Sequence, residues 1–473
     1  MKCLFATSEA QPFAASGGLA DVSGSLPHAL RQRLIGCRIV MPLYESIPDE
    51  LKDGMRFLTS FSVPVAWRRQ YCGVFETRYN GVVYYFLDNQ YYFKRKGMYG
   101  HYDDAERFAF FSRAVLEMLP LIDFKPDIIH CNDWQTALIP AYYNIFYSRN
   151  DWYKGIRTVF TIHNIQYQGQ YGLELYDDVF GIPPHSRWML DFNGGINLLK
   201  GAIESSDRVT TVSPSYSWEI RDPWFSHGLD PILNDRAWKI RGILNGIDTV
   251  SYDPSTDPEL YANYSVSDIS GKAVNKRKLQ EHLKLEQNAG VPLVAMVTRL
   301  VSSKGLDLVR AAFDQLMHEE NIQFVILGSG DWEYENFFRA MQEKYPGKVV
   351  FCRGFLSGFA RKVYAAADVF LMPSKAEPCG LAQMIALRYG TLPVVREVGG
   401  LRDSIRDNEN GFSFKSYDPV EMMECIKRAL AEYWQRDSWK DFIRQAMECD
   451  NSWVRSATQY INLYHEVIDE GTV

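Results

Sequence analysis

The sequence lacks the marks of several classes of protein. No run of about 18 apolar residues occurs, so the sequence predicts no membrane-spanning helix. The first residues, MKCLFATSEA, pass from one lysine into a short strand-like run without the apolar segment and cleavage site of a secretory signal. The eight cysteines form no CxxC pair and no cluster with histidines at metal-binding spacing. We therefore expect a cytoplasmic protein with reduced and mostly buried cysteines.

The chain also has fewer basic than acidic residues. The chain has 51 lysines and arginines against 58 acidic residues, which gives a net charge of -7 and a pI near 5.8. This balance provides no general attraction to nucleic acid or to an anionic membrane, so we expect neither as a partner. An anionic ligand would need cations gathered at its own site.

Strands and helices alternate along most of the chain. With 473 residues, the chain exceeds the roughly 250 to 300 residues at which one hydrophobic core stops growing. Continuous apolar strands between helices are typical of a parallel sheet covered on both faces. We therefore predict an α/β protein of two Rossmann-like domains around an interdomain cleft. The expected strands cover 2–6, 37–41, 82–87, 127–130, 157–162 and 208–212, then 291–298, 322–327, 349–352, 369–372 and 392–395.

The domain boundary is expected near residue 245. Asn245-Gly246 is a strong turn dipeptide and lies between the two series of strands. We predict an N-terminal domain at 1–245 and a C-terminal domain at 246–452. The segment 453–473 carries apolar residues at helical spacing, and we expect a helix that crosses back to the N-terminal domain.

Four segments place glycine, histidine or charged residues after expected strands, where open α/β sheets bind ligands. These are 16–21, 163–164, 299–305 and 377–381. The strings ATSEAQPFAASGGLADVSGSLP, TIHNIQYQGQYG, TRLVSSKGLDLV and FLMPSKAEPCGLAQMIALRYGTLPVV stand in family order, and the match runs almost end to end. In these strings the chain resembles the glycogen synthase and starch synthase family of retaining glycosyltransferases. The resemblance implies the GT-B fold, which consists of two Rossmann-like domains.

Arg299 and Lys304 follow the strand expected before residue 298. From spacing alone they fit a pair of exposed loop cations. The resemblance implies that they hold the diphosphate of a nucleotide sugar and neutralise its charge as it leaves. Losing such a donor typically raises the barrier by about 3 to 4 kcal/mol.

Glu377 precedes Pro378 and a helix that we expect to begin at Cys379 and to run to residue 387. From position alone, Glu377 also fits a charge at a helix N-terminus. The resemblance implies that Glu377 and the amides of Cys379 and Gly380 hold the donor glucose, while the amide of Leu381 meets phosphate. Related enzymes carry a second glutamate eight residues later, where this chain has isoleucine. A mechanism with that pair of carboxylates is therefore excluded.

His163 and Asn164 follow the strand expected at 157–162. A lone histidine after a strand is more often structural than functional. The resemblance implies that the His163 carbonyl faces the anomeric carbon of the reacting sugar and that its ring bonds a sugar hydroxyl. It also implies that Asp133 and Asn245 line the donor sugar and the acceptor entrance, although Asn245 fits a simple turn residue equally well.

The glycine-rich segment that contains Ser16, Gly17, Gly18 and Asp21 fits the family pattern, but the residue just before it does not. Relatives carry a lysine near the donor phosphates where this chain has Ala15. The glycines still let backbone amides approach phosphate ahead of a helix. Lys94 and Arg95 are candidates to supply the missing cation.

Two aromatic residues are candidates for stacking on the nucleobase. Phe355 matches a position from which the family stacks a ring on adenine, and Tyr99 is a second candidate. Either ring also fits the hydrophobic core, since 14% of the residues are aromatic.

The implied reaction transfers glucose from ADP-glucose, or from UDP-glucose, to the non-reducing end of an α-1,4-glucan such as glycogen or maltooligosaccharides. The resemblance implies retention of configuration, no metal and no cofactor. Ala15 also suits a catalytically weak glucan-binding or priming relative. A nicotinamide dehydrogenase is disfavoured, because no GxGxxG follows the first strand.

Overall fold

The computed structural model describes residues 1–354 and 356–470. It comprises two compact units, of which the first contains Met1–Ile243 and Trp453–Val473 and the second contains Leu244–Ser452. Within the described ranges, no helix has both the length and the apolar character needed to cross a membrane.

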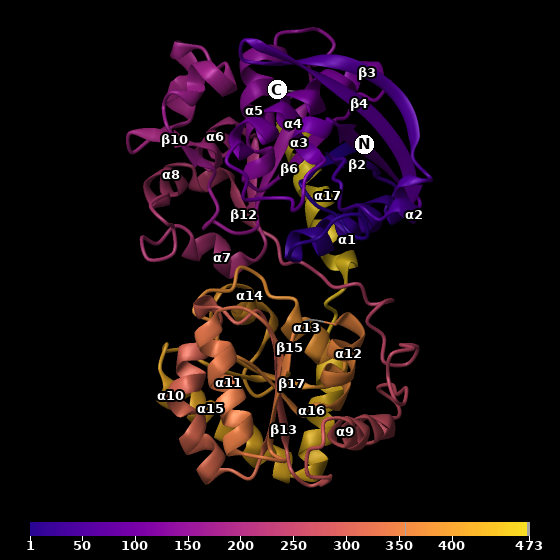
Figure 1. Ribbon diagram of the computed structural model, residues 1–473, viewed down its shortest axis with the longest axis vertical. Coiled ribbons are helices and arrows are strands. Elements are labelled where there is room, and N and C mark those ends of the chain that lie inside the picture. Colours follow the sequence, from indigo (N-terminus) through magenta and orange to yellow (C-terminus); the bar gives the residue numbers. More distant parts are fainter. Residues whose placement is uncertain (355, 471–473) are drawn as a thin grey trace. The chain divides into compact units, whose positions relative to one another are not determined.

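The N-terminal unit is built on a sheet in the order β12-β11-β7-β6-β1-β2-β5-β4-β3 (Figure 1). The two strands at one edge, β3 (Arg56–Val65) and β4 (Arg68–Tyr79), are antiparallel to their neighbours. The side chains of β3 are mostly exposed or half-buried, so this strand lacks the continuous apolar run on which the strand predictions rest. The parallel strands are β1 (Lys2–Ala6), β2 (Gly36–Pro42), β5 (Val82–Asp88), β6 (Ile128–Asn132), β7 (Arg157–Ile162), β11 (Arg208–Thr211) and β12 (Ile240–Gly242).

Helices and one small sheet complete this unit. The small sheet, in the order β8-β10-β9, consists of β8 (Gln170–Tyr171), β9 (Asp191–Phe192) and β10 (Gly195–Asn197). The helices are α1 (Gly18–Gln32), α2 (Asp49–Lys52), α3 (Gln90–Phe93), α4 (Asp104–Met118), α5 (Leu138–Tyr142), α6 (Leu198–Ser205), α7 (Pro214–Glu219), α8 (Asp230–Asp235) and α17 (Trp453–Glu470).

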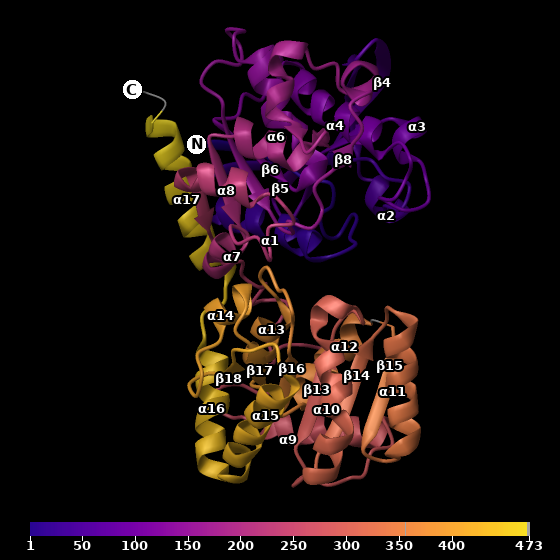
Figure 2. The ribbon, with the colours of Figure 1, turned by 90° about the vertical axis from the view of Figure 1, so that its left-hand side faces the viewer.

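The final helix, α17, packs against α1 of the N-terminal unit (Figures 1 and 2). Its Tyr464 hydroxyl lies 2.6 Å from Nδ1 of His130 in the buried sheet. At its end, Glu470 and Glu466 pair with Arg208 at the start of β11. The apolar face and these polar contacts explain why the chain returns after the second unit.

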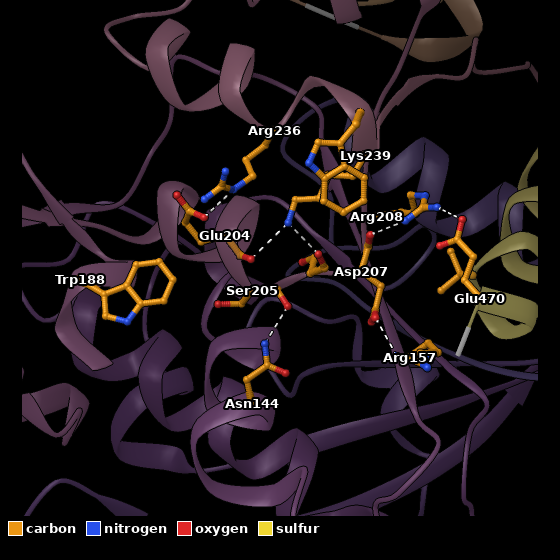
Figure 3. A pocket seen from close by; sticks show the side chains of 13 residues that line it. Asn144, Arg157, Trp188, Glu204, Ser205, Asp207, Arg208, Arg236, Lys239 and Glu470 are labelled. Atoms are coloured by element: carbon orange, nitrogen blue, oxygen red, sulfur yellow. Dashed lines mark hydrogen bonds and ion pairs between the residues drawn. The ribbon is translucent and has the colours of Figure 1, made fainter. Parts of the chain in front are cut away.

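A hollow of about 460 Å³ lies where α6, β11 and α17 meet (Figure 3). Nζ of Lys239 donates to the carbonyls of Glu204 and Ser206 at 3.2 and 2.9 Å, and Asn144 donates to the carbonyl of Ser205 at 2.8 Å. The last carbonyls of a helix have no partner within the helix, so these donors cap α6. We therefore assign the polar groups of this hollow a structural role.

The C-terminal unit is a fully parallel sheet in the order β15-β14-β13-β16-β17-β18, with helices on both faces (Figure 1). Its strands are β13 (Leu293–Val297), β14 (Gln323–Gly328), β15 (Val349–Arg353), β16 (Val369–Met372), β17 (Leu392–Arg396) and β18 (Phe412–Phe414). Its helices are α9 (Ser270–His282), α10 (Leu306–Glu319), α11 (Trp332–Lys344), α12 (Ser357–Ala366), α13 (Ala382–Arg388), α14 (Gly399–Ser404), α15 (Pro419–Trp434) and α16 (Arg436–Glu448).

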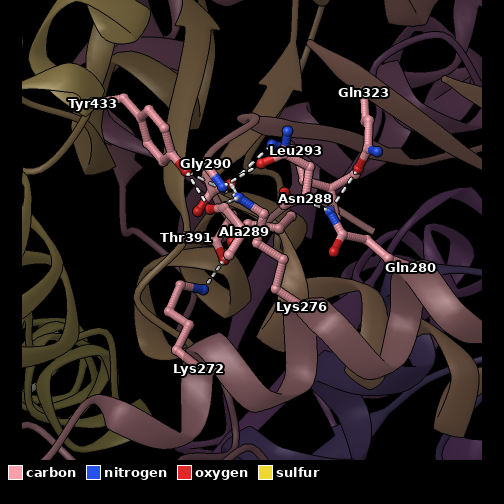
Figure 4. Close-up of polar contacts among 12 residues, drawn as sticks. Lys272, Lys276, Gln280, Asn288, Ala289, Gly290, Leu293, Gln323, Thr391 and Tyr433 are labelled. Atoms are coloured by element: carbon pink, nitrogen blue, oxygen red, sulfur yellow. Dashed lines mark hydrogen bonds and ion pairs between the residues drawn. The ribbon is translucent and has the colours of Figure 1, made fainter. Parts of the chain in front are cut away.

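Helix α9 carries two buried lysines toward this sheet (Figure 4). Lys276 forms an ion pair with Asp368 at 2.7 Å and also bonds the Tyr433 hydroxyl at 3.0 Å. Lys272 instead bonds two carbonyls and, at 2.7 Å, the hydroxyl of Thr391. Burial lowers the pKa of Lys272 to about 7, because its bonding partners are uncharged.

The predicted fold class is confirmed: two α/β units with parallel sheets, and a C-terminal helix that contacts α1. The expected Asn245-Gly246 turn is wrong. Asn245 is 6% exposed and forms no turn with Gly246, and Ile247 pairs with Ser452 soon after. The chain therefore enters the second unit without a turn at these two residues.

Candidate functional site

Two neighbouring strands, β6 and β7, bring predicted residues together at the carboxyl edge of the N-terminal sheet. Asp133 follows β6 and His163 follows β7, which pairs with β6 in parallel. Parallel strands end at the same edge, so both residues lie there. Oδ1 of Asp133 accepts the backbone N–H of His163 at 2.8 Å. Nε2 of His163 lies 2.9 Å from Oδ1 of Asn132, the last residue of β6.

Burial disfavours the charged forms of both Asp133 and His163. Burial raises the pKa of Asp133 to about 7, although the backbone N–H groups of His163 and Asn164 act in the opposite direction. Burial lowers the pKa of His163 to about 3, so its ring is neutral at physiological pH. Asp133 has φ of +57°, a conformation that is uncommon for residues other than glycine. Its bond to His163 therefore stabilises a strained position next to the site.

The loop before α1 is hydrogen-bonded to Glu9, a residue that sequence reasoning missed. Glu9, just after β1, is 4% exposed, and its carboxylate accepts the backbone N–H of Ser16. Burial raises the pKa of Glu9, while the hydrogen bonds from Ser16 and Gly17 act to lower it. An acidic residue three positions after an apolar strand was the available signal. Because Glu9 already engages these amides, the loop is less open to phosphate than the glycines alone suggested.

Gly17 and Gly18 are nevertheless exposed, and neither is required by the fold. A Cβ atom at either position would meet no atom within 4 Å, and Gly17 has an extended φ of -168°. Close approach of a ligand thus remains the prediction for them. Asp21 lies exposed in the first turn of α1, and Ala15 is also exposed.

The candidates for the missing cation and for base stacking differ in their contacts. Arg95 forms an ion pair with Asp103 at 2.6 Å, whereas Lys94 is exposed. The Tyr99 hydroxyl lies 2.7 Å from Oγ of Ser8, and its ring lies 6.1 Å from that of Phe108, so it is partly built into the core. The other stacking candidate, Phe355, lies outside the described residues.

In the C-terminal unit, two predicted catalytic residues meet across adjacent strands. Lys304 follows β13 and Glu377 follows β16, which pairs with β13. Nζ of Lys304 lies 2.6 Å from Oε2 of Glu377, and the Ser374 hydroxyl donates to the same oxygen at 3.1 Å. The Glu377 side chain is only 8% exposed, so this ion pair is well shielded from water. A charged pair at this edge of the sheet suits a polar, anionic ligand.

Arg299 differs from Lys304 in being exposed. Over the residues that the structure describes, its guanidinium makes no hydrogen bond or ion pair. It is therefore available to a ligand without first breaking an internal contact.

The helix after Glu377 begins later than predicted. α13 runs from Ala382 to Arg388, because Gly380 adopts φ of +73° and interrupts helical geometry before it. The backbone amides of Cys379, Gly380 and Leu381 have no hydrogen-bond acceptor within 1–354 and 356–470. These three amides precede the helix and face no competing partner, which keeps them candidates for oxygen ligands.

Two glycines that sequence reasoning did not single out are required here by close packing. A Cβ atom on Gly399 would lie 2.0 Å from the Glu377 carbonyl oxygen, and one on Gly400 would lie 2.1 Å from that of Cys379. The N–H of Gly400 donates to the Glu377 carbonyl at 3.1 Å. The Gly-Gly pair, separated from the end of β17 by two residues, was the signal that could have identified them.

Asn245 lies beside this segment of its own unit. Its backbone N–H is directed at the Cys379 thiol, and its side-chain Oδ1 is buried without a hydrogen-bond partner among the described residues. An unsatisfied buried oxygen is costly, which makes a purely structural role a poor account of this side chain.

Comparisons with known proteins agree with this arrangement. A family model described as "Starch synthase catalytic domain" matches residues 2–235, and one described as "Glycosyl transferases group 1" matches residues 278–446. Glycogen synthases of Geobacillus thermodenitrificans and Clostridium botulinum are 50% and 49% identical to this chain, over 99% of it and 98% and 99% of their own lengths.

A solved structure is similar over the same extent. The catalytic domain of starch synthase IV from Arabidopsis thaliana, bound to ADP and acarbose, superposes with a TM-score of 0.91 and 34% identity, and 99% of each chain is covered. These matches extend over both units and include the strand ends described above. The chain therefore belongs to the glycogen synthase and starch synthase family of GT-B glycosyltransferases.

Proposed function

We propose that this protein transfers glucose from ADP-glucose to the non-reducing 4-hydroxyl of an α-1,4-glucan, with retention of anomeric configuration. One observation carries the proposal: the shielded Lys304–Glu377 pair at the edge of the C-terminal sheet. A nucleotide sugar combines a diphosphate with a polyhydroxyl ring, and a cation paired with a carboxylate suits both parts. The starch synthase IV structure that contains ADP and acarbose supports ADP-glucose over UDP-glucose.

The C-terminal unit binds the donor in this proposal. Arg299 and Lys304 hold the diphosphate, and their charge stabilises it as it leaves. Glu377 and the free amides of Cys379 and Gly380 bind glucose hydroxyls, while the amide of Leu381 meets phosphate. Buried Asn245 completes the polar lining with its unpartnered oxygen.

The N-terminal unit serves the acceptor and the reacting carbon. The His163 carbonyl stabilises positive charge on the sugar as the bond to phosphate breaks. A phosphate oxygen of the departing diphosphate takes the proton of the acceptor hydroxyl, so no protein base is required. This agrees with the buried Ile385 at the position eight residues after Glu377, where a second carboxylate would otherwise stand.

The test is a comparison of the two donors with glycogen as acceptor. Release of ADP or UDP is followed with purified protein, and proton NMR of a maltooligosaccharide extended in a parallel reaction reports the anomeric configuration. We expect a higher kcat/KM for ADP-glucose and an α-linked product. Release of neither nucleotide would refute the proposal, and preference for UDP-glucose would refute its donor assignment. The variant Glu377→Gln provides a background in which turnover is strongly reduced.

A further inference from the structure

The amide group of Asn132 has only one possible orientation. Its Nδ2 donates to the carbonyl oxygens of Ala6 at 3.0 Å and of His130 at 3.3 Å. Both partners are acceptors, so the amide nitrogen must face them, and the flipped orientation would place two oxygens against oxygen. The side chain is fully buried at the end of β6, which leaves no water to compensate for such a flip.

This orientation determines where the His163 ring carries its proton. Oδ1 of Asn132 faces Nε2 of His163 at 2.9 Å and can only accept, so Nε2 must donate. Burial holds the pKa of this ring near 3, so the ring carries a single proton. Nδ1 is therefore a bare lone pair. In the part of the chain that the structure describes, no group hydrogen-bonds to Nδ1.

We propose that Asn132 is a positioning residue that holds His163 as the Nε2–H tautomer, so that Nδ1 accepts a hydrogen bond from a hydroxyl of the bound saccharide. The substrate half of this inference rests on the proposed function. A hydroxyl that must donate to Nδ1 keeps its oxygen lone pairs for other donors. Exchange of that hydroxyl for fluorine, which cannot donate, would then remove the bond.

A purely structural role for Asn132 makes different predictions. Asn132 also links β6 to β1 through the Ala6 carbonyl, so its loss would lower stability in either case. Only if Asn132 positions the ring should its loss also change which nitrogen of His163 is protonated and how the enzyme responds to fluorinated donors. A matched control is Thr136→Val, because the buried Thr136 hydroxyl donates to the Asn132 carbonyl at 2.8 Å without touching the imidazole.

The first test is nitrogen NMR of full-length protein labelled with ¹⁵N-histidine, in which His163 is assigned by its absence from the His163→Gln spectrum. We expect Nε2 to be protonated and Nδ1 bare in the wild type and in Thr136→Val. In Asn132→Leu, which is similar in size and lacks the acceptor, we expect a mixture of tautomers. A protonated Nδ1 in the wild type, or an unchanged tautomer in Asn132→Leu, would overturn the proposal.

The second test uses ADP-glucose and its analogues with fluorine in place of each hydroxyl in turn. In the wild type, we expect substitution at one position to lower kcat/KM about tenfold beyond the others, as the loss of one buried hydrogen bond implies. In Asn132→Leu, kcat/KM for ADP-glucose should fall, and the extra penalty at that position should shrink.

An equal penalty in both proteins would refute the role of Nδ1 even if the tautomer changed. Should the wild type fail to use either ADP-glucose or UDP-glucose, the proposed function would fall, and the NMR result would still decide the role of Asn132.

Discussion

The carboxyl edges of the two sheets carry different kinds of polar group. In the C-terminal unit, the groups that follow β13 and β16 are a full ion pair, Lys304 with Glu377, and the exposed cation Arg299. In the N-terminal unit, the groups are a neutral imidazole at His163 and two carboxyls, Glu9 and Asp133, whose pKa values are raised by burial.

The difference matches the two halves of a glycosyl transfer. Charge that develops on a diphosphate needs fixed cations, which the C-terminal edge supplies. Neutral saccharide hydroxyls suit the neutral imidazole of His163 in its desolvated setting, and burial makes ionisation of the neighbouring carboxyls Glu9 and Asp133 less favourable. This contrast supports our assignment of the nucleotide sugar to the C-terminal domain and of the glucan to the N-terminal domain.

Removal of Lys304 should have the largest effect. Its ammonium follows charge that grows as the diphosphate leaves, so Lys304→Ala should lower kcat by about a hundredfold or more and change KM less. Steady-state kinetics with ADP-glucose and glycogen measures this. Lys375→Ala, which removes an exposed cation two residues before Glu377, is the control and should retain activity. Near wild-type kcat in a folded Lys304→Ala would remove the main support for the contrast.

The buried lysine Lys272 should make the C-terminal unit more stable as pH rises. Its pKa is about 7 in the fold and near 10.5 when unfolded, so the unfolded chain binds more protons between these values. The free energy of unfolding should therefore rise by about 3 kcal/mol from pH 7 to 10 on its account. Lys272→Met should flatten this rise in urea unfolding curves. The exposed Lys278→Met on the same helix should leave the slope as it is, and an unchanged slope in Lys272→Met would contradict the assignment.

A new cation at position 15 should make the N-terminal sheet edge more like the C-terminal one, because it adds a positive charge for the diphosphate. Ala15 is exposed at the position where the family resemblance implies a lysine, so Ala15→Lys should tighten ADP-glucose binding by about 1 to 3 kcal/mol. Calorimetric titration measures the change, and Ala15→Met controls for side-chain length without charge. Unchanged affinity in Ala15→Lys would show that another cation, such as Lys94, already fills that role.

Asp133 should give the N-terminal unit a pH slope of the opposite sign. Its pKa is raised from 3.8 to about 7, so the folded state binds more protons between these values. The free energy of unfolding should then fall by about 2 kcal/mol from pH 5 to 7. Asp133→Asn should remove this fall, while Asp151→Asn, at a side chain 92% exposed, should not. If the free energy of unfolding still fell between pH 5 and 7 in Asp133→Asn, the decrease would belong to another group, with Glu9 the first candidate.

Sequence patterns predicted the parallel strands well, because strands buried on both faces must be apolar throughout. β1, β7 and β16 have the predicted bounds, the other predicted strands differ by a residue or two, and the short parallel strands β12 and β18 were not predicted. The pattern missed the antiparallel β3 and β4, whose exposed positions interrupt the apolar run. It also placed the start of α13 too early, because propensity did not show that Gly380 takes a left-handed conformation.

The sequence by itself determined the fold class and which strand ends carry polar residues, because periodicity and residue type are local properties. Only the tertiary structure decided how those residues are charged and paired. The Lys304–Glu377 bond joins residues 73 positions apart, and the contact between Asn132 and His163 spans 31 positions. Burial and strand order create these contacts, and they set the pKa values and the tautomer on which the proposed chemistry depends.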